Sequence, residues 1–218
     1  MADKDTSRDI SSIRKDYALK TLSESELSSD PIAQFEQWFG EALNSEVLEP
    51  NAMTLATVDQ TNAPSARIVL LKGVEEGKFW FFTNYLSTKG RQMAENPHVS
   101  LLFFWPELQR QVRVDGVVSK LTAEQSDAYF HSRPVGSRIG AVASPQSDVI
   151  PDRRILESRV KELEQKYSDG KVPRPEHWGG YQVKPEKIEF WQGRSSRLHD
   201  RFRYTMFQSR WTISRLAP

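Results

Sequence analysis

Three cationic or imidazole side chains alternate in the C-terminal part of the chain. In the stretch IEFWQGRSSRLHDR (188–201), Arg197, His199 and Arg201 follow the break at Gly193 at every second position, with no carboxylate at the positions of that alternation. Alternation at period two places these side chains on one face of an extended segment. Because like charges repel, such a face indicates an anionic or aromatic ligand. The alternative is a solvated edge strand whose cations deter pairing with other strands.

A second group of polar side chains surrounds a predicted helix break. Tyr129 and Arg133 lie four residues apart on a helix that Thr122 would cap, and Ser137 follows the interruption at Pro134. Two hydroxyls and a guanidinium near a helix break are suitable ligands for a phosphate monoester. The alternative is a half-buried tyrosine beside an arginine that caps helix carbonyls.

A predicted strand over residues 65–72 carries a cation at each end of an apolar run. Arg67 and Lys72 are five positions apart, so a regular strand would point them to opposite faces. They would serve one site only through a bulge, or they would serve different groups; cations at strand ends are also ordinary solubilising residues. Weaker individual donors are Thr83, Lys89, Gln146 and Ser147.

The composition narrows the chemistry further. The chain has no cysteine, and its four histidines are far apart, without the spacing of a metal site. No Gly-x-Ser-x-Gly elbow and no glycine-rich dinucleotide or P-loop unit is present. Many phosphate-binding side chains without an acid/base pair or metal cluster are typical of an enzyme whose cofactor supplies the chemistry.

Charge and hydropathy set limits on partners and location. Thirty basic and twenty-nine acidic residues give a net charge of +1, which argues against nucleic-acid and membrane partners. The apolar runs are too short to span a bilayer, and the polar start MADKDTSRD lacks the apolar core of a secretory signal. We therefore expect a soluble, cytoplasmic protein without a metal.

The elements that must position these residues are mainly short strands. We predict strands over 53–58, 65–72, 79–83, 99–104, 110–121, 204–207 and 211–213, besides the 188–201 stretch. Helices are predicted from Pro31 and over 88–95, 122–133 and 152–167, with 135–151 irregular and 168–180 a connector. Short strands joined by tight turns indicate a mainly β, antiparallel barrel or sandwich with flanking helices. We expect one domain over 30–218 after a mobile, polar segment over 1–29.

Several segments, taken together, resemble one family. They are RIVLLK (67–72), the strand with Gln111, YFHSRP (129–134) with Ser137, QS (146–147), HWGG (177–180), IEFWQG and RLHDR within 188–201, and the terminal RLAP. In this order they resemble the pyridoxine (pyridoxamine) 5′-phosphate oxidase family over nearly the whole chain from Arg14 onward. RLHDR is the most specific of them.

The resemblance implies an FMN-binding split β-barrel that forms a homodimer with FMN at the subunit interface. It implies oxidation of pyridoxamine 5′-phosphate and pyridoxine 5′-phosphate to pyridoxal 5′-phosphate, with hydride transfer to the flavin. Dioxygen would be the electron acceptor, and the products would include hydrogen peroxide and, from the amine, ammonia. This reaction is the last step of vitamin B6 cofactor synthesis and salvage.

The resemblance also implies a role for each matching position. FMN would contact Arg67, Ile68, Val69, Leu70, Leu71, Lys72, Phe82, Thr83, Lys89, Gln111, Gln146, Ser147, Trp191 and Arg201. The substrate would contact Lys72, Tyr129, Arg133, Ser137, Arg197, Leu198 and His199, under a lid formed by Arg14, Lys15, Asp16 and Tyr17. Arg197 and His199 would be the catalytic pair, orienting the pyridine ring and supporting charge changes near the reacting carbon.

One position departs from the family pattern, and other functions remain open. Thr88 stands where the family usually has an arginine at the FMN phosphate, so either Arg91 compensates or FMN binds more weakly. The alternatives are a non-catalytic flavin or pyridoxal-phosphate binding protein and a split-barrel flavin reductase using a nicotinamide. The complete set of substrate residues argues against both. Near-zero net charge argues against a third, a nucleic-acid-binding barrel.

Overall fold

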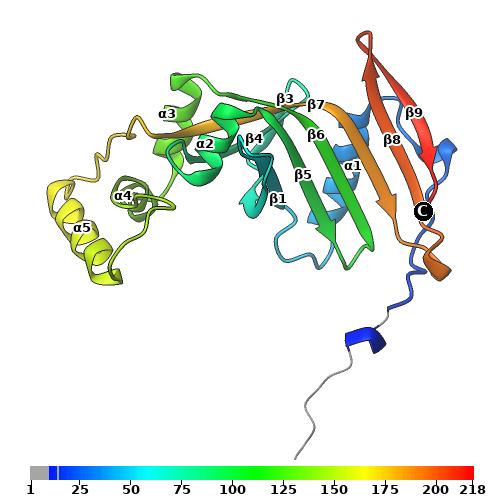
Figure 1. Cartoon of the computed structure of the whole chain (residues 1–218), viewed down its shortest axis with the longest axis horizontal. Helices are drawn as coiled ribbons and strands as arrows, with labels where there is room; N and C mark the ends of the chain where they lie inside the picture. Colours follow the sequence, from blue (N-terminus) through cyan, green and yellow to red (C-terminus); the bar gives the residue numbers. More distant parts are fainter. Residues whose placement is uncertain (1–9, 14) are drawn as a thin grey trace, which may run out of the picture.

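A curled antiparallel sheet forms the centre of the computed structural model, which describes residues 10–13 and 15–218 (Figure 1). Its strands are β1 (Ala52–Val58), β2 (Pro64–Leu70), β3 (Gly73–Glu75), β4 (Lys78–Asn84), β5 (His98–Trp105), β6 (Arg110–Lys120), β7 (Trp178–Gln192), β8 (Asp200–Phe207) and β9 (Arg210–Leu216). The order is β2-β1-β5-β6-β7-β4-β3, and the β8–β9 hairpin is joined to β7.

The long strand β7 makes the sheet curl. Its first residues pair with β4, its last residues pair with β8, and β6 runs beside nearly all of it. A register shift interrupts the β6–β7 ladder between Asp115 and Gly116. A Cβ on Gly116 would lie 2.2 Å from the Lys184 carbonyl oxygen, so only glycine allows this close approach. The result is a half-barrel in which β4 and β8 leave β7 at its two ends.

Helix α1 (Pro31–Leu43) fills the concave side of the half-barrel. Asp30 caps it by accepting a hydrogen bond from the Ile32 amide, and Pro31 occupies the first turn, as predicted. Phe35 packs on Phe79 (ring centroids 4.9 Å apart), and Trp38 packs edge-on against Phe190 (5.2 Å). These aromatic side chains belong to the main core and are at most 2% exposed. Burying each contributes roughly 1.5–3 kcal/mol.

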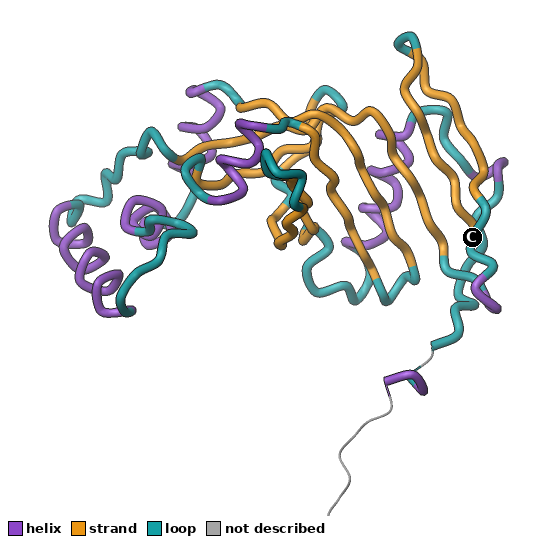
Figure 2. Tube along the Cα trace, in the orientation of Figure 1, coloured by secondary structure: helices purple, strands orange, loops and turns teal. Residues whose placement is uncertain are grey.

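Four further helices flank the sheet, and three of them gather at one end of the molecule (Figures 1 and 2). They are α2 (Thr88–Glu95), α3 (Ala123–Ser132), α4 (Val135–Ala143) and α5 (Arg153–Lys166); short 3₁₀ turns are η1 (Ile10–Ser12), η2 (Glu24–Glu26) and η3 (Ser195–Arg197). Around α3 and α4 lies a second core cluster of Phe130, Ile139, Val172 and Trp178. The predicted class, mainly antiparallel β with flanking helices, is confirmed.

The prediction that residues 135–151 are irregular is wrong for the first half of that range. Pro134 does not end helical structure there but stands at the N-cap of α4. Gly136 and Gly140 lie within this helix. Burial of Ile139 and Ala143 stabilises α4 despite the low helix propensity of glycine.

The segment before α1 lies against the half-barrel. Leu22 is 5% exposed and belongs to the main core, and the Tyr204 hydroxyl donates a hydrogen bond to the Ser28 carbonyl. The mobility predicted for residues 1–29, and the division of the chain at residue 30, stay predictions. No helix of the described residues is long and apolar enough to cross a membrane.

Candidate functional site

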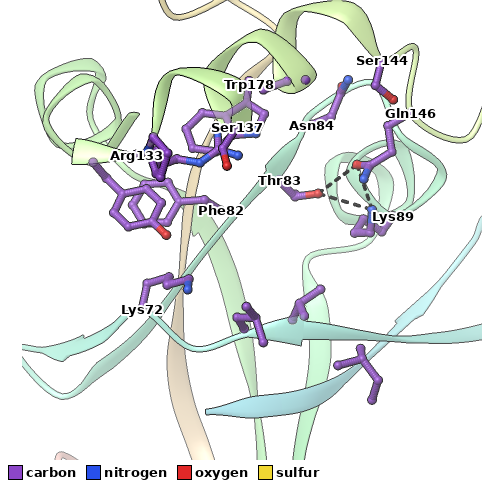
Figure 3. A pocket seen from close by; sticks show the side chains of 17 residues that line it. Lys72, Phe82, Thr83, Asn84, Lys89, Arg133, Ser137, Ser144, Gln146 and Trp178 are labelled. Carbon is purple, nitrogen blue, oxygen red and sulfur yellow. Dashed lines mark hydrogen bonds between the residues drawn. The ribbon is translucent and has the colours of Figure 1, made fainter. Parts of the chain in front are cut away.

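A cavity of about 590 Å³ lies between strands β2 and β4 and helices α3 and α4; we call it the α3–α4 hollow (Figure 3). Its lining includes eleven of the predicted site residues: Ile68, Val69, Leu70, Lys72, Phe82, Thr83, Lys89, Tyr129, Arg133, Ser137 and Gln146. The hollow thus combines an apolar wall from β2 with three cations. Its volume is ordinary for a small-molecule site.

Lys89 sits at one side of this hollow with neutral partners only. Its Nζ donates to Gln146 Oε1 (3.1 Å), Ser87 Oγ (3.2 Å) and Thr83 Oγ1 (3.3 Å). It is 8% exposed, and no carboxylate of the described residues pairs with it. Burial, with added repulsion from Arg67, lowers the pKa of Lys89 to about 8. A buried cation without a counter-charge favours an anionic ligand.

Arg133 is held on the other side by aromatic rings rather than by an acid. Its guanidinium lies over Trp178, 4.7 Å from the ring centroid, and its buried Nη1 has no hydrogen-bond acceptor. Tyr129 stacks on Phe82 at 3.8 Å, and Phe82 stacks on Trp178 at 5.6 Å. The stack therefore positions Tyr129 and Arg133 while leaving guanidinium N–H groups available for a ligand.

Glycine permits this stack. A Cβ on Gly180 would lie 2.8 Å from a ring carbon of Phe82 and 2.5 Å from the Leu121 side chain. Trp178 and Gly180 lie at the start of β7, although the sequence predicts a connector over 168–180. The pattern HWGG was visible in the sequence, but the contact that requires Gly180 comes from β4, almost a hundred residues earlier.

A second hollow of about 500 Å³ lies beside the β7–β8 loop; we call it the C-terminal hollow. Its lining contains five predicted substrate residues: Lys15, Asp16, Tyr17, Arg197 and His199. Trp191 forms an aromatic group with Tyr17 (5.8 Å, edge-on) and His199 (4.5 Å). A Cβ on Gly193 would lie within 2.9 Å of three Tyr17 atoms. Tyr17 therefore packs directly against the backbone of Gly193, where only glycine leaves room for it.

The orientation of His199 is fixed by a backbone hydrogen bond. The Arg194 amide donates to His199 Nδ1 (3.1 Å), so the neutral ring carries its proton on Nε2. Partial burial, and then the charges of Arg197 and Arg201, lower the pKa of His199. His199 is therefore a neutral Nε2–H donor near neutral pH.

The prediction that Arg197, His199 and Arg201 share one face of an extended segment is wrong. Residues 195–197 form the turn η3, and Ser196 and Arg197 have positive φ angles of 55° and 62°. Arg201, on β8, is held by Glu189, with Nε and Nη2 each 2.8 Å from Oε1. A carboxylate does lie beside these cations, because the neighbouring strand β7 brings Glu189 into contact with Arg201.

The other predicted residues that the structure describes lie outside both hollows. Arg67 donates to Thr57 Oγ1 (2.6 Å), and Leu71 belongs to the main core. Gln111 pairs with Trp191 across β6 and β7, and Trp191 pairs with Arg201 across β7 and β8. Ser147 and Leu198 are exposed, and Arg14 lies outside the described residues.

Thr88, the position that departs from the family pattern, lies at the start of a helix. Thr88 opens α2, and the Arg91 guanidinium donates to the Leu86 carbonyl. Arg91 lines a different cavity from the one that contains Lys89. The two cavities share Asn84, Ser144 and Gln146, and compensation by Arg91 stays a prediction.

The two hollows lie toward opposite ends of the folded molecule. In Figure 1, α3 and α4 are at one end of the long axis, and the loop between β7 and β8 is near the other. The described residues contain no group of acidic, histidine or cysteine side chains that could hold a metal ion. A half-barrel with helices gathered at one end is the architecture of a split-barrel protein, and its cationic, partly apolar hollow has the chemistry to attract a small anion.

Comparison with known proteins identifies the family. The model described as "Pyridoxamine 5'-phosphate oxidase" matches residues 39–167, and that described as "Pyridoxine 5'-phosphate oxidase C-terminal dimerisation region" matches residues 178–218. The chain belongs to the pyridoxine/pyridoxamine 5′-phosphate oxidase family, which confirms the resemblance and the prediction of an oxidoreductase.

Individual relatives support the same family assignment. Proteins named pyridoxine/pyridoxamine 5′-phosphate oxidase from Cyanothece sp. and Paraburkholderia phymatum are 54% and 56% identical, each over 96% of this chain and 98–99% of their own length. PhzG from Burkholderia lata, solved in complex with tetrahydrophenazine-1-carboxylic acid, superposes with a TM-score of 0.87 at 30% identity, covering 92% of this chain and all of that one. An FMN-binding, oxidase-related protein from Nostoc punctiforme has the same fold (TM-score 0.69, 15% identity, 88% of this chain and all of that one).

Proposed function

We propose that this protein oxidises pyridoxamine 5′-phosphate and pyridoxine 5′-phosphate to pyridoxal 5′-phosphate, as an FMN-containing homodimer with dioxygen as the acceptor. Hydrogen peroxide, and ammonia from the amine, would be the other products. FMN, when bound, supplies the acceptor for the substrate's hydride and passes the electrons to dioxygen. The relatives' names and the family support the choice of substrate.

The separation of the two hollows carries the proposal. Arg133 and Ser137 line one hollow, whereas Arg197 and His199 line the other, at the far end of the same chain. One small substrate cannot touch both sets within a single chain. A twofold dimer would bring the α3–α4 hollow of one protomer to the C-terminal hollow of its partner, and the match to a dimerisation region supports this assembly.

An exposed sheet face offers the surface for such a dimer. Ile68 is 64% exposed and Phe104 50%, on the outer side of β2 and β5. Phe104 pairs with Gln111, and the row continues through Trp191 to Arg201. Apolar side chains that are exposed together in one chain mark a contact surface. A cofactor at this surface would meet Gln111, Trp191 and Arg201 from one protomer.

The residues of the α3–α4 hollow fit two phosphorylated ligands. Lys89, Thr83 and Gln146 form a donor group without an acid, suited to the FMN phosphate, and Ile68–Leu70 offer an apolar wall. Arg133, Tyr129, Ser137 and Lys72 form a separate group for the substrate phosphate. The buried Arg133 Nη1 without an acceptor is the observation that favours an anion there.

The C-terminal hollow then orients the pyridine ring. Neutral His199 would donate from Nε2, and Arg197 would stabilise negative charge near the reacting carbon. Tyr17, packed on Trp191, would cover the substrate and exclude water. Each of these residues binds or orients, which is sufficient when the cofactor accepts the hydride.

An absorbance spectrum followed by two assays tests the function. We expect the purified protein to be yellow and to form aldehyde from both phosphorylated substrates with uptake of dioxygen. Unphosphorylated pyridoxamine, which offers nothing to Arg133, should react far more slowly. A colourless protein that stays inactive with added FMN would contradict the proposal, bound flavin without turnover would indicate a carrier, and oxidation of NADH would indicate a flavin reductase.

A further inference from the structure

We propose that Asp200 is a positioning residue that holds the loop 193–199, and with it Arg197 and His199, in its working shape. The inference rests on the proposed function only for its effect on turnover, since the geometry stands without it. Four side chains take part: Asp200, Arg194, Arg215 and Glu24, which we call the Asp200 clamp.

Asp200 joins three separate segments of the chain. Its Oδ2 accepts from Arg194 Nη1 (2.7 Å) and from the Leu22 amide (3.1 Å), and its Oδ1 accepts from Arg215 Nη1 (3.0 Å). The side chain is only 11% exposed, although Asp200 is the first residue of strand β8. One buried carboxylate thus connects the loop, the N-terminal segment and the last strand.

The outer part of the clamp strengthens this arrangement. Arg215 also donates to both Glu24 oxygens (2.8 and 3.1 Å), and its guanidinium lies 4.4 Å above the Phe202 ring. Burial opposes the charge of Asp200, but the hydrogen bonds from Arg194, Leu22 and Arg215 outweigh it and lower its pKa. Asp200 therefore keeps its charge and its partners at neutral pH.

The loop needs such a restraint because its conformation is an uncommon one. Ser196 and Arg197 both adopt positive φ, a region that non-glycine residues occupy only when their surroundings over-determine it. The Arg194 amide bonds to His199 Nδ1, and the Arg194 side chain bonds to Asp200, the next residue after His199. These two bonds close the loop at its base and aim the Arg194 amide at the imidazole.

Two variants of the full-length, FMN-loaded protein test the inference. Asp200→Asn keeps the shape but removes the charge, and Arg194→Met breaks the same link from the partially exposed partner, should Asp200→Asn fail to fold. Displacement of the catalytic groups by about 1 Å can cost about 10²-fold, so we expect kcat to fall at least about tenfold while FMN content stays close to one per chain.

A second readout does not depend on turnover. Nitrogen-15 NMR of histidine-labelled protein, with the signal assigned by His199→Asn, should show His199 as the Nε2–H tautomer in the wild type. In both clamp variants we expect exchange between tautomers and a pKa of His199 shifted toward that of a free imidazole. Glu157→Gln, which removes an exposed ion pair with Arg153 on α5 and touches no member of the clamp, is the matched control and should resemble the wild type in both readouts.

The outcomes separate the two proposals. A wild type without turnover would reject the proposed function, whereas the NMR result would still decide on the clamp. Unchanged His199 signals in both clamp variants would overturn the positioning role. A parallel fall in melting temperature, FMN content and kcat with a normal His199 signal would also overturn it, because Asp200 would then serve the fold as a whole.

Discussion

The two hollows hold their cations by different means. In the α3–α4 hollow, Lys89 is surrounded by hydroxyl and amide oxygens and Arg133 lies over an indole, without a carboxylate of the described residues on either. Around the C-terminal hollow, Arg194 and Arg201 are paired with the buried acids Asp200 and Glu189. Arg197 stands out there, since no described carboxylate pairs with it.

The contrast separates cations that shape the protein from those that bind. A cation paired with a buried acid is already neutralised and fixes a backbone, whereas one held by neutral groups keeps its attraction for an incoming anion. By this criterion we expect Lys89, Arg133 and Arg197 to bind ligands, and Arg194 and Arg215 to be structural. The predictions below test that division, beginning with the largest effect.

Combining two defective variants should restore activity. Arg133→Leu and Arg197→Leu should each lower kcat/KM by about 10- to 100-fold, since a charged hydrogen bond contributes about 1.5–3 kcal/mol. Co-expressed with different tags, they would form hybrid dimers in which one site has both arginines intact. With random assortment about a quarter of the wild-type activity should return. Failure of the purified hybrid to recover activity would show that the two hollows do not share a substrate.

Lys89→Met should have opposite effects on cofactor binding and on stability. We expect FMN affinity to fall by about 10- to 100-fold through loss of a charged contact. The FMN-free protein should become more stable, because the variant no longer buries an unpaired cation. Fluorescence titration with FMN and thermal melting measure the two effects, and Lys161→Met on the exposed side of α5 is the control. A variant that melts earlier without FMN would indicate that Lys89 is structural.

The lowered pKa of Lys89, about 8 against an ordinary value of 10.5, sets the pH dependence. The unfolded chain binds more protons between these values, so stability of the FMN-free protein should rise with pH through this window. FMN binding should change in the opposite direction because it requires charged Lys89: affinity should begin to decrease about one pH unit below 8 and fall steadily above it. In Lys89→Met both slopes should be absent from this window.

Trp178→Leu should raise KM for the phosphorylated substrate by about 5- to 30-fold, since a desolvated cation–π contact contributes about 1–2 kcal/mol. Trp178→Phe, which keeps an aromatic face beneath Arg133, should have a smaller effect. Steady-state kinetics with both variants measures the difference. Equal losses for Phe and Leu would show that Trp178 acts by filling the second core cluster instead.

The smallest effect is expected for a substitution at Gly193, against which Tyr17 packs. Gly193→Ala would place a Cβ within 2.9 Å of the Cβ, Cγ and Cδ2 atoms of Tyr17 and so displace Tyr17 from Trp191; we expect a rise in KM of about two- to fivefold, up to about 1 kcal/mol. Gly40→Ala in α1, where an added Cβ meets nothing within 4 Å, is the matched control and should stabilise the helix slightly. Identical kinetics for Gly193→Ala and wild type would show that the Tyr17 contact does not serve the substrate.

Local signals in the sequence predicted much of the fold. Helix α2 has the predicted bounds, and Asp30 and Thr122 cap the helices expected of them, because a cap depends on neighbouring residues only. Helix α4 was missed because its glycines and the preceding proline favour a loop locally, whereas tertiary burial of Ile139 stabilises the helix.

The candidate site was predicted less evenly. The family resemblance predicted most of the α3–α4 hollow: eleven of the predicted site residues line this one cavity. The structural partners could not be predicted, because Glu189 and Asp200 gain their roles only when β7, β8 and β9 lie side by side. Period-two alternation failed at Arg197 for a related reason: a turn with positive φ is stabilised by contacts from distant segments.

The placement of two indoles gives the molecule its own optical reporters. Trp178 lies against Arg133 in one hollow, and Trp191 lies against His199 beside the other. With the other five of the six tryptophans replaced by phenylalanine, a variant that retains only Trp178 or only Trp191 would emit from a known hollow. Rapid mixing of such variants with FMN or substrate would then show in what order the parts of the site fill.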